Sequence, residues 1–157
     1  MPVEVLGDEM ESRDVKSAHP HTVRVAGVSP DSSLEAVAGW VDIDVHLVVT
    51  AATVGSRSTV FGITTFPPGA RHQKIHRHLY SEEVEYLLEG SGIAGVGDDD
   101  VEMQAGAVTF AAADEWHGFE NTSATERALM VWCYEGAARL EDARHVQEDP
   151  GGGEPNR

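Results

Sequence analysis

Hydrophobic and polar residues alternate along most of this chain, in short runs separated by glycine, proline and acidic turns. Over residues 41–49, valine, isoleucine and leucine occupy the odd positions, and mostly polar residues occupy the even ones. This period-two alternation is typical of a strand with one apolar face. Similar patterns predict further strands over residues 59–66, 72–78, 83–88, 93–96, 101–103, 108–111, 116–121 and 128–134. Short strands with glycine-rich turns, at spacings of about 8–12 residues, indicate an all-β antiparallel sandwich or barrel.

The two ends of the chain have weaker patterns. Val23, Val25 and Val28 predict one short strand, and residues 32–38 predict a capped helical turn. Residues 137–146 have helix-like spacing, and the Gly- and Pro-rich segment that follows is typical of a disordered tail. We therefore expect an N-terminal arm over residues 1–39, a barrel over 40–136, and a short helix or flexible acidic tail over 137–157.

The composition of the chain indicates which classes of partner it can bind and in which cellular compartment it is expected. The 27 acidic residues outnumber the 11 basic ones, for a formal net charge of −16. Such a surface repels phosphate backbones and anionic lipids, so we expect neither nucleic acid nor membrane as a partner. The single cysteine, Cys133, cannot form an internal disulfide, and its apolar surroundings predict a small buried hydrophobe rather than a nucleophile. No signal-peptide pattern and no apolar run long enough to cross a membrane are visible in the sequence, so we expect a cytoplasmic protein.

Candidate chemistry begins with the sequence His76-Arg77-His78 in a predicted strand. Alternate side chains of a strand share a face, and a rise of about 3.3 Å per residue separates the two histidines by roughly 6.5 Å. Imidazoles at that separation can converge on one cation. Glu83 begins the next predicted strand and can join them if the intervening residues turn. The alternative is a polar strand face with solvated histidines, which we consider less consistent with these residue types at this spacing.

A second histidine-bearing segment follows the glycine-rich part of the chain. His117 comes after a predicted strand and turn, and it starts a strand of its own. With this segment the chain resembles the cupin superfamily, through two motifs in order across roughly residues 40–135. The first motif is matched by Gly69, His76, His78, Glu83 and Gly90, and the second by Gly106, His117 and Asn121. The chain departs from the family pattern in one extra residue between Gly69 and His76, and in Ala112 and Asp114, where the family usually has proline and glycine.

The resemblance implies a double-stranded β-helix, or jelly-roll barrel, with one divalent transition metal inside it. Its ligands here would be His76, His78, Glu83 and His117. Glu82 is the alternative carboxylate, but Glu83 places Gly90 in the family's register. Histidine and carboxylate ligands suit iron, manganese, nickel, copper and zinc alike, so the sequence does not select the metal. Resembling proteins commonly dimerise, so we also expect a homodimer.

Glu85 is the candidate catalytic residue. It lies two positions beyond Glu83 on the same predicted strand, so it also faces the barrel interior. A buried carboxyl group that is raised toward neutral pKa can act as a general acid or base, and the alternative is a hydrated residue near the barrel mouth. Further residues that we predict to line a substrate pocket are His72, Phe61, Ile63, Phe119 and Trp132.

Three functions follow from this site. We favour a metal-dependent oxidoreductase that acts on a small oxygenated organic molecule by a dioxygenase-type oxidation, with Glu85 moving a proton. The second is non-oxidative Lewis-acid catalysis of the cyclase, isomerase or decarboxylase type, because short segments around Thr53, Pro68 and Tyr80 look like cupins that act as polyketide cyclases. The third is a non-catalytic cupin that binds a small molecule, which has no need of four metal ligands.

Overall fold

The computed structural model describes residues 18–32, 43–143 and 145–147, and for residues 72–75, 141, 145 and 147 it describes the backbone alone. The strand-forming patterns pair into two antiparallel sheets. The first has the strand order β1-β2-β9-β4-β7, with β1 at Asp44–Val49, β2 at Thr59–Phe66, β9 at Ala128–Glu135, β4 at Glu83–Glu89 and β7 at Val108–Ala111. The second has the order β10-β3-β8-β5-β6, with β10 at His145–Gln147, β3 at Arg71–His78, β8 at His117–Glu120, β5 at Ser91–Val96 and β6 at Asp99–Gln104.

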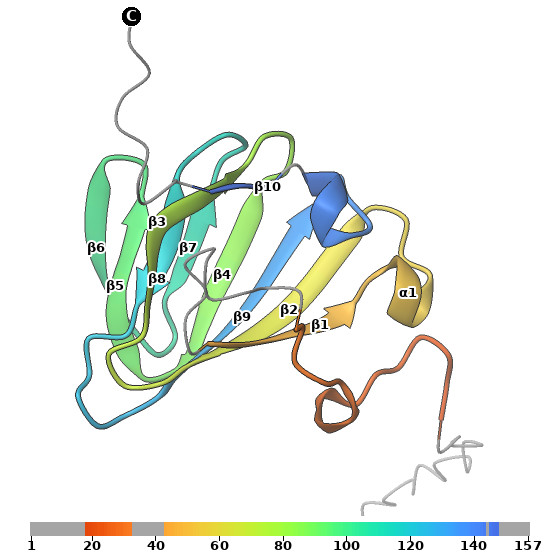
Figure 1. Ribbon diagram of the computed structural model, residues 1–157, viewed down its shortest axis with the longest axis horizontal. Helices are drawn as coiled ribbons and strands as arrows, with labels where there is room; N and C mark the ends of the chain where they lie inside the picture. The colour runs from red at the N-terminus through yellow and green to blue at the C-terminus, as the bar shows by residue number, and fades with distance from the viewer. Residues whose placement is uncertain (1–17, 33–42, 144, 148–157) are drawn as a thin grey trace, which may run out of the picture.

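The two sheets form the two walls of a jelly-roll barrel (Figure 1). Side chains of β2 and β9 alternate strictly between the interior and the outer face, with buried residues at every second position. The register pairs Gly62 with Trp132 and Thr64 with Met130, so these four residues point into the barrel. A β-carbon at Gly62 would overlap the indole ring of Trp132. The absence of a side chain at Gly62 therefore leaves room for the ring.

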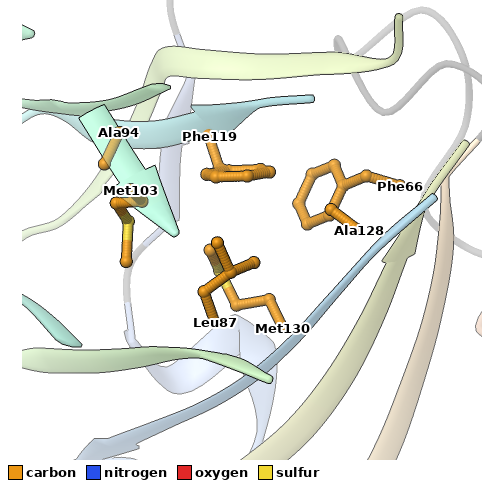
Figure 2. Packing of buried hydrophobic residues seen from close by; sticks show 7 residues of the cluster. All are labelled: Phe66, Leu87, Ala94, Met103, Phe119, Ala128 and Met130. Carbon is orange, nitrogen blue, oxygen red and sulfur yellow. The ribbon is translucent and has the colours of Figure 1, made fainter. Parts of the chain in front are cut away.

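Apolar side chains from both sheets fill one end of the barrel. Phe66 and Phe119 meet edge to face, with ring centroids 5.0 Å apart and an interplanar angle of 62°. Figure 2 shows these two rings, with side chains from four further strands packed around them. The complete cluster consists of Phe66, Leu87, Ala94, Met103, Phe119, Ala128 and Met130. Because this end of the barrel is filled, space for a ligand has to lie toward the other end.

Gly90 shows why the first motif ends in a glycine. It adopts a φ of +87° at the turn between β4 and β5, a conformation that side chains with a β-carbon disfavour. A β-carbon there would also lie 2.7 Å from the carbonyl oxygen of Arg127 and 2.9 Å from the Cα atom of Ala128. The position therefore excludes a side chain for two independent reasons.

The structure differs from the sequence analysis at three places. The predicted strand at residues 23–28 is the 3-10 helix η1 (Val25–Gly27), which buries no residue and therefore has no apolar face to pair on a sheet. The predicted helix over 137–146 is instead the 3-10 helix η3 (Leu140–Ala143) followed by β10, because His145–Gln147 pair with β3. The short helix α1 (Ala51–Val54) was not predicted, although Thr50 and Thr53 form its capping box.

The predicted turn at residues 32–38 lies outside the described residues. Among the helices that the structure does describe, none is long and apolar enough to span a bilayer.

Candidate metal centre

Four buried side chains from three strands converge between the two sheets. His76 and His78 come from β3, His117 is the first residue of β8, and both strands belong to the second sheet. Glu83 is the first residue of β4 in the opposite sheet. The cluster therefore bridges the two walls of the barrel and depends on the whole fold.

The register of β3 on β8 brings the histidines together. His76 pairs directly with His117, and their ring centroids lie 4.2 Å apart. The register between these strands shifts between His72 and His76, so β3 has more residues than β8 over this stretch. The additional residues of β3 before His76 therefore leave this histidine paired with His117.

Potential ligand atoms of these four residues all lie within 4.8 Å of one another. One oxygen of Glu83, Oε2, lies 2.9 Å from Nε2 of His78, 2.9 Å from Nε2 of His117 and 3.9 Å from Nε2 of His76. Two metal–ligand bonds of about 2.1 Å span about 4.2 Å, so atoms at such separations can surround one ion. A divalent transition metal therefore fits this set of three imidazoles and one carboxylate, and His76, His78, Glu83 and His117 could hold it.

The protonation of the cluster is unusual. Burial by itself would raise the pKa of Glu83, but hydrogen bonds with His117, His76 and His78 hold that pKa well below its usual range. Burial would lower the pKa of His117, but its hydrogen bond and charge interaction with Glu83 raise the pKa to about 9. Both shifts have one cause, the close approach of the imidazoles to the Glu83 carboxylate, and a metal bound there would displace the proton of His117.

The loop before β8 orients His117. Nδ1 of His117 donates a hydrogen bond to the carbonyl oxygen of Glu115 at 2.8 Å, which leaves Nε2 directed at the other three residues. The side chain of Glu115 accepts a hydrogen bond from the backbone N–H of Ala112 at 2.9 Å. Asp114 adopts a φ of +66°, and its N–H donates to the carbonyl oxygen of His78 at 2.7 Å. Aspartate tolerates this conformation better than most residues with a side chain, so Asp114 replaces the glycine that resembling proteins usually have there.

A cavity opens beside the cluster and contains about 350 Å³ of space, part of it open to solvent. Glu85 lines it, is buried, and within the described part of the chain its Oε2 atom has no hydrogen-bond partner. Burial raises the pKa of Glu85 to about 7, and the charge of Glu83 adds to this rise while His117 opposes it. A carboxyl group with such a pKa can both accept and donate a proton near neutral pH.

Among the residues predicted to line the pocket, some line the cavity and others do not. Trp132 lines the cavity, whereas Phe119 belongs to the apolar cluster at the filled end of the barrel. Phe61 and Ile63 lie on the outer face of β2, because Val60, Gly62 and Thr64 occupy its inward positions. The backbone of His72 pairs with Phe119, and its side chain lies outside the described part of the structure. Lining residues that the sequence analysis missed are Thr64, Phe66, Met130, Tyr134 and Leu140.

Cys133 is partly buried on β9, and its thiol is free. Burial raises its pKa, and the charges of Glu83 and Glu135 raise it further. A raised pKa lowers the thiolate fraction at neutral pH, so we expect iodoacetamide to alkylate Cys133 more slowly than glutathione at pH 7.5. The rate should rise about tenfold per pH unit below the pKa, because the thiolate is the nucleophile. Mass spectrometry of timed samples measures it, and alkylation as fast as that of glutathione would contradict the expectation.

Comparisons with known proteins agree with this architecture. Residues 62–134 match the family described as "Cupin domain". An oxalate-binding protein of Thermotoga maritima is 26% identical over 109 residues, which cover 69% of this chain and 89% of that protein. The protein described as polyketide synthase CurC of Streptomyces cyaneus is 29% identical over 106 residues, which cover 68% of each chain.

A solved structure from Klebsiella pneumoniae supports the fold. That uncharacterized protein with a double-stranded β-helix domain superposes with a TM-score of 0.60 at 16% identity, over 82% of this chain and 97% of its own. At that identity the similarity speaks for the fold alone. The two motifs, the jelly-roll topology and the family match agree, and we conclude that residues 62–134 form a cupin domain.

Proposed function

We propose that this cupin is a metal-dependent enzyme that oxidises a small, oxygen-bearing organic molecule with dioxygen. The observation that carries the proposal is Glu85, a buried carboxyl group in the same cavity as the four candidate metal ligands. A bound divalent metal would supply Lewis acidity and, if it is iron, manganese or copper, redox capacity. His76, His78, Glu83 and His117 would hold this metal, and four protein ligands would leave room for substrate oxygens on it.

In this proposal Glu85 moves the proton that the substrate loses when its enol or hydroxyl oxygen binds. Glu85 faces the cavity two residues after Glu83 and pairs with Trp132 across the sheet. Its Oε2 atom makes no hydrogen bond within the described part of the chain, so a substrate proton can be received there. Glu85 itself is only 5% exposed, so little bulk water can compete for this proton.

Replacement of Glu85 by glutamine tests this role. Glutamine keeps the size of the side chain but cannot accept the proton, so we expect turnover to fall by at least about 100-fold. The metal content should stay unchanged, because Glu85 is not among the four candidate ligands. Oxygen uptake with a panel of a flavonol, a catechol and a 1,3-diketone measures turnover, and elemental analysis measures the metal.

Glu82→Gln is the matched control, since Glu82 is the exposed carboxylate next to Glu83. This variant should keep both turnover and metal. Full activity in Glu85→Gln, or a comparable loss in Glu82→Gln, would contradict the proposed role of Glu85.

A second candidate is non-oxidative catalysis, in which the metal polarises a carbonyl group and Glu85 removes the proton next to it. The similarity to the protein described as polyketide synthase CurC favours it. Turnover by the zinc-loaded protein under strict anaerobiosis would support this second reaction and exclude the oxidation.

A third candidate, a non-catalytic binder, is favoured by the similarity to an oxalate-binding protein. Tight binding by the chelator-stripped protein without any turnover would support it.

A homodimer and a cytoplasmic location belong to the same proposal. Sedimentation of the purified protein tests the first, and fractionation of cells tests the second.

A further inference from the structure

Three aromatic rings line one side of the cavity, in a series from β3 to β9. His78 and Tyr134 have ring centroids 4.8 Å apart, and Tyr134 and Trp132 stack at 5.6 Å with an interplanar angle of 10°. The series therefore runs from a candidate metal ligand along β9 to the indole ring. Because these two rings stack on each other, a flat molecule held by one end near His78 would contact the parts of Tyr134 and Trp132 that line the cavity.

Two features fix the indole of Trp132 in place. Its Nε1 donates a hydrogen bond to Oγ1 of Thr64 at 2.8 Å. The ring also covers Gly62, where a β-carbon would overlap it, so the sheet supports one side of the indole. Because Trp132 also lines the cavity, the indole is a rigid apolar surface that does not need to be ordered when a ligand binds. Thr64 accepts from Trp132 and keeps its own hydroxyl proton to donate to a ligand oxygen.

The charges around the cavity disfavour a multiply charged anion. Glu83 and Glu85 both contribute carboxyl groups to its wall. Within the part of the lining that the structure describes, no lysine or arginine side chain is present, and the remaining wall is largely apolar. A dianion or a phosphate ester buried here would have only the metal as a counter-charge, and burial of a charge without partners is costly.

We infer that the cavity binds an uncharged, planar organic molecule whose ring lies against Trp132 and whose oxygens face the candidate metal ligands. This inference rests on the proposed function and narrows its substrate class. It assigns specificity to Trp132 and Thr64, which contact the ring and an oxygen of the ligand rather than the metal.

Two diketones isolate the contribution of the ring. Benzoylacetone and acetylacetone carry the same pair of oxygens, and one methyl group of the second is replaced by a phenyl ring in the first. We expect the zinc-loaded protein to bind benzoylacetone about tenfold more tightly than acetylacetone by calorimetry, because only benzoylacetone has a ring that can pack against the indole. Oxalate and glucose 6-phosphate, a dianion and a phosphate ester, should bind more weakly than benzoylacetone.

Variants of the aromatic wall connect this preference to Trp132. Trp132→Leu should reduce the ratio between the two diketones to about twofold or less, and Trp132→Phe, which keeps a flat ring, should retain most of it. Phe110→Leu is the matched control, since Phe110 is an exposed aromatic residue on β7 and does not line the cavity. Each variant is compared at equal metal content and after its thermal unfolding has been recorded.

An unchanged ratio in folded Trp132→Leu, or tighter binding of oxalate or glucose 6-phosphate than of benzoylacetone, would overturn the inference and leave the proposed enzyme class standing. A protein that takes up no metal would instead contradict the proposed function. The diketone ratio is then measured on the metal-free protein, where the same preference is expected because Trp132, not the cation, contacts the ring.

Discussion

Replacing His78 with alanine is expected to lower the affinity for a divalent metal by at least about 100-fold, since even residues that only support metal ligands contribute about 10–100-fold. Nε2 of His78 lies 2.9 Å from Oε2 of Glu83, so the substitution removes one of four buried ligand atoms. The fold should survive, because Glu83 retains its contact with His117 at 2.9 Å. Elemental analysis after dialysis, together with a metal titration of the chelator-stripped protein, measures the change.

The same experiment gives a stability readout. A metal that binds only the folded protein stabilises it by about 2.7 kcal/mol at a concentration of 100 times its Kd. Added metal should therefore raise the Tm of the wild-type protein and leave that of His78→Ala almost unchanged. His21→Ala is the control, because His21 is exposed and lies outside the cluster. Stoichiometric metal in dialysed His78→Ala would disprove the four-ligand site.

The sequence predicted the cluster because spacing and strand parity are local properties. His76 and His78 share a face of β3 by alternation alone, and Glu85 follows Glu83 into the interior for the same reason. The pairing of His76 with His117 is a long-range property, since these residues lie far apart in the chain. It could be predicted only through the resemblance to a family in which both motifs occur.

The alternation of residues along a strand did not predict which face points inward where both faces carry residues that could be buried. On β2, the bulky Phe61 and Ile63 alternate with Val60, Gly62 and Thr64, and we expected the bulky pair to face the interior. The interior takes the smaller set instead, because the indole of Trp132 from the neighbouring strand occupies the space above Gly62. Packing between β2 and β9 decides which face of β2 points into the barrel. The sequence of β2 alone does not show this packing.

The weak pattern at the C-terminal end of the chain was only partly correct, for a related reason. Leu140 and Ala143 do lie in a short helix, but it is the 3-10 helix η3, from which they pack against the cluster around Val60 and Trp132. The backbone beyond them pairs with the open edge of β3, and a free sheet edge provides hydrogen bonds that an exposed helix would have to form internally. Local propensity could not predict this pairing because it depends on where that edge lies.

Asn121 links the two sheets, and its replacement is expected to have the largest effect on stability. Its Nδ2 lies 3.0, 3.0 and 2.8 Å from the carbonyl oxygens of Phe66, Pro67 and Glu126, so its two N–H groups serve three acceptors and one of them is shared. Its Oδ1 accepts one from the backbone N–H of Ser123 at 3.0 Å. The side chain is buried, so these backbone groups have no direct access to water. The second motif therefore ends in an asparagine because this amide satisfies the backbone of two loops.

We expect Asn121→Ala to reduce the free energy of unfolding by about 3–5 kcal/mol, since each buried group left without a partner costs about 1–3 kcal/mol. Asn121→Asp should be at least as destabilising, because a carboxylate oxygen would replace the amide nitrogen and face three carbonyl oxygens. Urea unfolding measures both, with Thr122→Ala, an exposed neighbour, as the control. A loss below about 1 kcal/mol would show that water replaces these hydrogen bonds. Because Asn121 donates to no metal ligand, the molecules of Asn121→Ala that remain folded should bind as much metal as the wild-type protein, which separates the structural role of the second motif from its chemical one.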